Sequence, residues 1–222
     1  MKAILINGSP RKKRNTAQML AAAEEGAKAA GAETEWIHLY DYEFTGCKSC
    51  FACKLKNSTT EGICAPRDAA RPLLEKAVDA DVLIFGSPVY FGYPTGQLRS
   101  FLERLLFPNM TYLAGPDGKY LPGARRQIMT GVIYTMNCPE GMMKQLNYPT
   151  LLETTAESID SIFGHSEVLY AYDTYQFGDY ARYDITAFSE EHKREWREQQ
   201  FPRDLEAARQ LGMRLVELAR EA

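Results

Sequence analysis

The sequence lacks the features of a membrane, secreted or nucleic-acid-binding protein. No apolar run approaches the roughly twenty residues of a membrane-spanning helix. A strand-like run begins at Lys2, which leaves no room for a signal peptide. The formal net charge is −3, so no basic excess indicates nucleic acid. The five cysteines, three of them close together, do not suit a disulfide framework. We therefore expect a cytoplasmic protein without a membrane or nucleic-acid partner.

Several familiar nucleotide and phosphate motifs are also missing. A P-loop needs Gly-x4-Gly-Lys-Ser/Thr, but counting from Gly8 puts Lys13 at the second glycine. The dinucleotide fingerprint Gly-x-Gly-x-x-Gly fails at Pro10 and Lys13. No cysteine has an arginine at the Cys-x5-Arg spacing of low-molecular-weight tyrosine phosphatases, and Asn7-Gly8 stands where response regulators need acidic residues. The sequence therefore excludes P-loop proteins, proteins with the dinucleotide fingerprint, low-molecular-weight tyrosine phosphatases and response regulators.

What the sequence does contain is apolar runs that alternate with helical periodicity. With 222 residues and 45% hydrophobic content, the chain suits one domain over residues 1–222. Strands are predicted at residues 2–7, 33–39, 81–86, 127–135 and 167–172. Helices are predicted at residues 17–30, 68–78 and 148–163, after Pro202, and around Leu98, Phe101, Leu102 and Leu105. This alternation predicts a doubly wound, five-stranded parallel α/β sheet with helices on both faces.

The loop after the first strand has the composition of a phosphate site. In an open parallel sheet such a loop lies at the carboxyl end of the strand, where ligands bind. Unpaired N–H groups at the start of the next helix favour an anion. Short polar side chains and a cation add further donors, namely Ser9, Arg11, Asn15 and Thr16. The alternative is an ordinary strand–helix turn with solvated basic residues.

A second candidate loop runs from Ser87 to Thr95. It would lie beside the first loop if the strand order is 2-1-3-4-5. Glycines and prolines make it a rigid curve, while Tyr90, Phe91 and Tyr93 supply flat apolar surface. A planar ring system could lie there. The alternative is a structural turn whose aromatic side chains belong to the core.

Together these loops resemble a known family. Gly-Ser-Pro-Arg after the first strand, Asn-Thr opening the helix and Gly-Ser-Pro-Val-Tyr-Phe-Gly after the third strand are similar to the flavodoxin-like NAD(P)H-dependent FMN reductases. The resemblance spans Met1 to about Arg104. It implies FMN, with the phosphate near the first-loop residues Ser9, Arg11, Asn15 and Thr16. It also implies that the ring lies against the second loop, at Pro88, Val89, Tyr90, Phe91 and Gly92.

A cysteine segment resembles the iron–sulfur flavoprotein branch of that family. The spacing Cys47-x2-Cys50-x2-Cys53 lets three thiolates cap one face of a [4Fe–4S] cluster, and Cys64 could supply the fourth ligand. Two features depart from the branch: ten residues separate Cys53 from Cys64, and the acidic pair that follows in relatives is reduced to Arg67-Asp68. A zinc site is less natural because its cysteines come as separated pairs. Two interpretations therefore stand side by side: the cysteines hold a [4Fe–4S] cluster, or they are free thiols.

The resemblance implies an FMN-dependent NAD(P)H oxidoreductase, in which hydride passes from nicotinamide to the flavin and onward to an acceptor such as a quinone or a flavin. The flavin carries the chemistry, so we assign no catalytic acid or base. The alternative is an iron–sulfur flavoprotein or flavodoxin-like electron carrier that serves a protein partner.

Two segments fall outside the alternation, at residues 107–126 and 173–201. The first is rich in glycine and proline, so we expect a long loop. The second combines aromatic residues with many charges. We expect it to cover a neighbouring subunit of a homodimer or homotetramer, as the resemblance also implies. Its alternative is a lid on its own chain.

Overall fold

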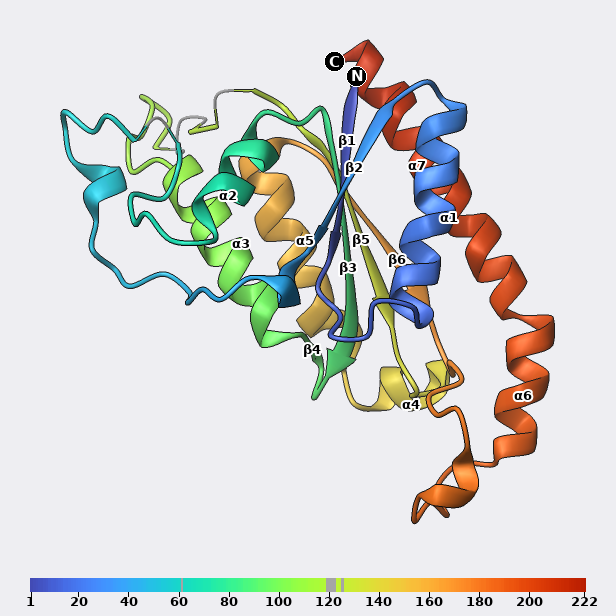
Figure 1. Ribbon diagram of the computed structural model, residues 1–222. Coiled ribbons are helices and arrows are strands. Elements are labelled where there is room, and N and C mark those ends of the chain that lie inside the picture. The colour runs from blue at the N-terminus through green and yellow to red at the C-terminus, as the bar shows by residue number, and fades with distance from the viewer. Residues whose placement is uncertain (61, 119–122, 125) are drawn as a thin grey trace.

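The computed structural model describes residues 1–60, 62–118, 123–124 and 126–222 as a twisted sheet between two layers of helices (Figure 1). The parallel strands follow the order β2-β1-β3-β5-β6. They are β1 (Lys2–Asn7), β2 (Glu33–His38), β3 (Val82–Tyr90), β5 (Met129–Thr135) and β6 (Ser166–Ala171). Numbered along the chain, these five strands have the order 2-1-3-4-5, so the predicted doubly wound, flavodoxin-like fold class is confirmed.

Helices cover both faces of this sheet. On one face lie α1 (Asn15–Ala29) and α7 (Phe201–Glu221). On the other lie α2 (Arg71–Val78), α3 (Gly96–Asn109) and α5 (Tyr148–Phe163). Two further helices are α4 (Glu140–Gln145) and α6 (Glu190–Gln199), and the short 3₁₀ turns are η1 (Leu39–Asp41), η2 (Ala52–Lys54) and η3 (Tyr180–Arg182).

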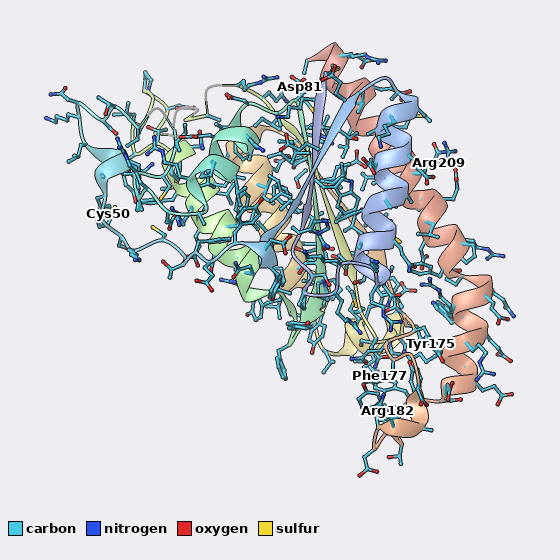
Figure 2. The ribbon with its side chains drawn as sticks, in the orientation of Figure 1. Cys50, Asp81, Tyr175, Phe177, Arg182 and Arg209 are labelled. Carbon is cyan, nitrogen blue, oxygen red and sulfur yellow. The ribbon has the colours of Figure 1, made fainter. Side chains whose placement is uncertain are left out.

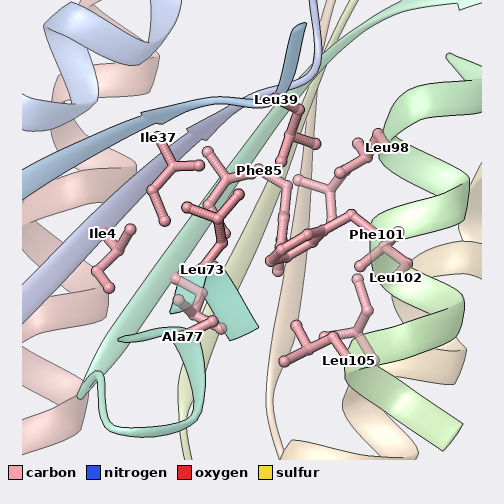
Figure 3. Packing of buried hydrophobic residues seen from close by; sticks show 14 of the residues in the cluster. Ile4, Ile37, Leu39, Leu73, Ala77, Phe85, Leu98, Phe101, Leu102 and Leu105 are labelled. Atoms are coloured by element: carbon pink, nitrogen blue, oxygen red, sulfur yellow. The ribbon is translucent and has the colours of Figure 1, made fainter. Parts of the chain in front are cut away.

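The strands are buried on both sides, which is why their sequences read as continuous apolar runs. In β1, Ile4 and Ile6 face α2, α3 and α5, whereas Leu5 faces α1 and α7. On the first side Phe85 packs against Phe101 of α3 in the core cluster (Figure 3). Each such side chain contributes about 1.5–3 kcal/mol when fully buried.

Small residues let α1 and α7 approach closely. A Cβ on Gly26 would lie 1.8 Å from the Arg209 carbonyl oxygen, and one on Gly212 would lie 1.9 Å from that of Ala23. Neither position could therefore carry a side chain without separating the helices. α7 is 21 residues long but amphipathic. Across the described ranges, no helix is both long and apolar enough to span a bilayer.

The structure corrects the expected elements in three places. β3 continues to Tyr90 instead of ending at Gly86, and a two-residue turn returns the chain as β4 (Tyr93–Pro94). The sheet therefore has six strands rather than five. α4 and α6 were not predicted, because their short or highly charged sequences give little apolar periodicity. α3 continues to Asn109, past the predicted loop start at Phe107, while residues 119–122 and 125 of that loop lie outside the described residues.

Candidate functional site

The loop between β1 and α1 is held at the carboxyl end of the sheet. The Gly8 N–H donates to the Gly86 carbonyl oxygen at 2.8 Å, and the Thr95 hydroxyl donates to the Gly8 carbonyl oxygen at 2.7 Å. The Ser9 N–H donates to Asn7 Oδ1 at 2.9 Å, and Ser9 is buried. Backbone and side-chain bonds thus join the first loop to the β3–β4 region, which confirms that the two predicted loops are neighbours.

The N-terminus of α1 opens onto this loop. Its N-cap position, Arg14, makes no side-chain capping bond, and its first turn carries no acidic residue. The first N–H groups of a helix have no partner within the helix and carry partial positive charge. An anionic group is the natural partner for such an end. Arg11, exposed on the loop, adds a cation whose Nη1 donates to the Gln176 carbonyl oxygen at 2.8 Å.

Asn15 and Thr16 lie on this turn, but their side chains are engaged by the protein. Asn15 Nδ2 donates to the Tyr175 carbonyl oxygen at 3.0 Å, and Asn15 Oδ1 accepts from Arg197 Nη1 at 3.0 Å. The Thr16 and Thr135 hydroxyls are 2.7 Å apart. Both residues are buried. Sequence reasoning missed Thr135, Tyr175 and Arg197, because no local pattern links them to the loop.

The β3–β4 hairpin presents a flat aromatic surface beside that loop. Phe91 and Gly92 form its two-residue turn, with φ of 52° and 84°, as a type I′ turn requires. The side chain of Phe91 is 94% exposed, and Tyr90 and Tyr93 are also exposed. Pro88 and Val89 are half-buried behind them. The aromatic residues therefore lie on the surface rather than in the core.

Segment 173–201 folds back onto its own chain. Tyr175 and Gln176 contact the first loop through their carbonyl groups, as described above. Beyond them the segment projects past the end of the sheet, where Figure 2 labels Tyr175, Phe177 and Arg182. Phe177 packs against Tyr180 and Tyr183, with ring centroids 5.2 and 4.2 Å away. A contact with a second subunit, and hence a homodimer or homotetramer, stays a prediction.

A buried ion pair anchors this segment at the end of β5. The Lys193 ammonium contacts the Asp173 carboxylate and the Asn137 carbonyl oxygen. His192 Nε2 lies 2.6 Å from the other Asp173 oxygen. Burial lowers the pKa of Lys193, and the Asp173 carboxylate opposes that shift. Lys193 and Asp173 are both almost inaccessible to solvent, so breaking one partner would leave a buried charge unpaired.

The four clustered cysteines line one cavity at the side of the molecule. Cys47, Cys50, Cys53 and Cys64 all contribute to its wall, together with Glu103 and Arg104 of α3. We call this site the cysteine cavity. Cys64 is buried, whereas Cys50 is exposed on the outer loop, far from the lower end of the sheet (Figure 2). The structure places the cavity against the second half of α3.

Two side chains of α3 hold the cysteine segment. Glu103 Oε2 accepts from the Cys47 N–H at 3.0 Å, and Arg104 Nε donates to Cys64 Sγ at 3.3 Å. Between the cysteines, Ser49 and Phe51 have φ of 51° and 55°. That left-handed conformation costs about 1–2 kcal/mol for a residue with a side chain. Such strain is concentrated at functional sites.

The charges around the cavity are also perturbed. Arg104 holds the pKa of the Asp68 carboxyl below its usual range, through a hydrogen bond that outweighs the effect of burial. Burial raises the pKa of the Cys53 thiol, although nearby Lys54 opposes the shift. Burial lowers the pKa of Lys54 itself. Two cations therefore act on these thiols: Arg104, which bonds Cys64, and Lys54, which opposes the shift at Cys53.

The donor set suits an iron–sulfur cluster better than a single metal ion. Among the described residues, no three Cys, His, Asp or Glu side chains stand close enough to hold one ion. Four thiols around one cavity match the ligand type and number of a [4Fe–4S] cluster, which takes one thiolate on each iron. The cavity holds about 20 Å³, so the match to a cluster rests on its four thiols and not on its volume.

Curated relatives match the first half of the chain. An iron–sulfur flavoprotein of Archaeoglobus fulgidus is 42% identical over 104 residues, which are 47% of this chain and 48% of the relative. Another from Methanosarcina thermophila is 36% identical over 104 residues, 47% of this chain and 52% of the relative. An FMN-dependent NADH:quinone oxidoreductase of Gluconacetobacter diazotrophicus is 37% identical over 78 residues, 33% of this chain and 38% of the relative. The chain thus matches about half the length, or less, of these relatives.

The fold as a whole is similar to that of a solved oxidoreductase structure. An NAD(P)H:quinone oxidoreductase from Methanothermobacter marburgensis has a TM-score of 0.67 at 16% identity, over 97% of this chain and 96% of that one. Residues 1–119 match the sequence model of the family described as NADPH-dependent FMN reductase. That match covers more than half of the 222 residues and includes both loops at the sheet end. The chain therefore belongs to the NADPH-dependent FMN reductase family.

Proposed function

We propose that this chain binds FMN between the β1–α1 loop and the β3–β4 hairpin, and that it oxidises NAD(P)H. The observation that carries the proposal is the pairing of two surfaces at one sheet edge. One is an uncapped helix N-terminus beside Arg11, and the other is the exposed aromatic turn at Phe91. A phosphate suits the first surface. A planar ring system suits the second. FMN has both groups at its two ends.

Within this proposal each protein group has a defined part. Ser9 and the first-turn N–H groups of α1 bind the phosphate, and Arg11 adds charge to that contact. Asn15 and Thr16 shape the loop from within through their bonds to Tyr175 and Thr135. The segment from Pro88 to Gly92 flanks the ring. Bound FMN would supply the hydride and electron chemistry, so no residue is assigned as an acid or base.

We further propose a small electron acceptor such as a quinone or a flavin. Relatives named FMN-dependent NADH:quinone oxidoreductase support this substrate class. The exposure of Tyr90, Phe91 and Tyr93 leaves an open surface on which nicotinamide and acceptor could bind in turn. The alternative is a protein as the electron acceptor. That function would require the flavin to be buried and the cluster to lie beside it at an exposed edge.

Binding of FMN and riboflavin to the purified chain tests the cofactor. We expect FMN to bind at least tenfold more tightly than riboflavin, because only FMN carries the phosphate. Bound FMN should then bleach on addition of NADH or NADPH, and a quinone should restore its colour. Equal affinity for the two flavins would contradict the phosphate loop. Failure of both nicotinamides to reduce bound FMN would contradict the enzyme.

A second function is favoured by the cysteine cavity. We propose that Cys47, Cys50, Cys53 and Cys64 would hold a [4Fe–4S] cluster, which would supply one-electron chemistry beside the hydride chemistry of the flavin. The supporting observation is that all four thiols line one cavity. α3 begins just after Thr95, which bonds Gly8 of the first loop, and carries Arg104 at the cavity. Nine residues of helix rise by roughly 13 Å, so one helix connects the first loop with the cavity.

Iron content tests the cluster directly. We expect about four irons per chain after anaerobic purification, because a [4Fe–4S] centre has that stoichiometry. Cys50→Ser should abolish the iron and leave FMN binding unchanged. Cys138, whose thiol is no part of the cavity wall, provides the matched control, so Cys138→Ser should keep both. Anaerobic wild-type protein with FMN but no iron or sulfide would contradict the cluster and leave the cysteines as free or redox-active thiols.

A further inference from the structure

Arg104 makes a complete set of hydrogen bonds around the cysteine cavity. Its Nε donates to Cys64 Sγ at 3.3 Å. Its Nη1 donates to Asp68 Oδ2 at 2.6 Å and to the Thr45 carbonyl oxygen at 3.3 Å. Its Nη2 donates to Asp68 Oδ1 at 2.9 Å and to the Pro66 carbonyl oxygen at 3.5 Å. A guanidinium has five N–H donors, and here each one has an acceptor.

This arrangement leaves the side chain no other orientation. The guanidinium is planar, so the two-pronged contact with Asp68 also fixes the direction of the Nε–H bond. Arg104 is 2% exposed, and a buried cation that lost these partners would pay a large desolvation cost. The donor that meets Cys64 is therefore a rigid part of the protein rather than a mobile surface charge.

From this geometry we infer that Arg104 positions the Cys64 sulfur as a cluster ligand and raises the reduction potential of the cluster. The inference rests on the cluster proposed above. Reduction adds one electron, and so one negative charge, to the group held by the thiolates. A fixed N–H donor and a buried cation beside one sulfur stabilise that added charge, and hydrogen bonds to the sulfurs are among the factors that set cluster potentials.

The sequence around Cys64 helps to explain why one residue, Arg104, can position its sulfur. Four residues after the fourth cysteine the chain carries a carboxylate, Asp68. That carboxylate is the one that anchors Arg104. Ten residues separate Cys64 from Cys53, so Cys64 stands outside the compact run of the other three cysteines. The hydrogen bond from α3 supports Cys64 across 40 positions of sequence.

A redox titration of anaerobic, cluster-loaded protein tests the inference. In Arg104→Met, which removes both the charge and the donors, we expect reduction of the cluster to be about tenfold less favourable, a downward shift of about 59 mV for a one-electron couple. Arg104→Lys keeps a cation but cannot contact Asp68, the carbonyls and the sulfur together, so its shift should be intermediate. Its electron paramagnetic resonance spectrum should also differ from wild type.

The matched control is Lys48→Met, which removes an exposed cation from the wall of the same cavity. Solvent screens that charge, so the equilibrium constant for reduction of the cluster should change by less than about twofold. Loss of iron from both Arg104 variants, with FMN retained, would also support the positioning of Cys64. If either Arg104 variant binds as much iron as wild type and its cluster has the wild-type reduction potential, this inference is overturned. The cluster proposal would then still stand. Absence of iron from the wild-type chain would overturn the cluster and this inference together.

Discussion

The two candidate sites of this chain are built in different ways. The flavin-side loops, at residues 8–16 and 87–95, leave the ends of two neighbouring parallel strands, and backbone register places them side by side. The cysteine cavity is lined by an irregular segment after β2, and two side chains of α3 hold that segment in place. The first site depends on the sheet. The second depends on a few polar contacts between distant residues.

This difference predicts how each site responds to substitution. A site made by strand ends should keep its shape when a single side chain is lost, because the backbone remains in position, so only the contact of that side chain is removed. A site held by Glu103 and Arg104 should be lost or altered when one contact is removed. α3 is common to both sites, since Thr95 at its start bonds the first loop and Arg104 lines the cavity. Disrupting α3 should therefore damage both sites at once.

Phe101→Ala should have the largest effect on stability and should damage both sites. Phe101 is fully buried in α3, and its ring lies 6.4 Å from that of Phe44, which precedes the cysteines. We expect the free energy of unfolding to fall by about 3–5 kcal/mol, with losses in both FMN and iron. Denaturant unfolding measures this. Phe91→Ala, the same truncation at an exposed position, is the control and should change stability by less than about 0.5 kcal/mol.

Arg11→Gln should separate the two sites. Loss of a hydrogen bond to a charged phosphate costs about 1.5–3 kcal/mol, so FMN should bind roughly tenfold to a hundredfold more weakly. Riboflavin affinity and iron content should not change. Fluorescence titration with each flavin measures the effect. Lys28→Gln removes a cation at the other end of α1 and should leave FMN binding intact. Equal weakening by both variants would point to general electrostatics instead of a phosphate contact.

Phe91→Asn should separate stability from cofactor binding within the flavin-side loops. Asn-Gly is the preferred pair for a type I′ turn, so relief of the positive φ at Phe91 should stabilise the protein by about 1 kcal/mol. The same change removes flat surface and should weaken FMN several-fold. Thermal unfolding without FMN and titration with FMN give the two values. If Phe91→Asn destabilises the free protein, the turn is not strained.

Asp68→Asn should have the smallest effect, and it depends on pH. The folded-state pKa of Asp68 is depressed, so its carboxylate stabilises the fold above the unfolded-state value of about 4. That contribution is lost as pH falls below 4 toward the lower folded-state pKa. The variant should lose about 1 kcal/mol or less at pH 7, because Asp68 is a third exposed. Below pH 4, its melting temperature should then depend less on pH than that of wild type.

Much of the fold could be predicted because it follows from local patterns. β1 and α5 were predicted with the bounds that the structure has, since apolar runs and helical periodicity involve only near neighbours. The turn at Phe91 was harder. The sequence indicated a rigid aromatic curve, but a non-glycine residue at positive φ is uncommon, so the continuation of β3 and the sixth strand were missed.

The sequence by itself determined the doubly wound sheet, the place of the phosphate-type loop and the group of cysteines that could act together. Only the tertiary structure decided that Asn15 accepts from Arg197, 182 positions away, and that Arg104 meets Cys64. The physical reason is that strands and helices arise from interactions between close neighbours in the chain. Hydrogen bonds between distant side chains exist only after the whole sheet and its helices have packed.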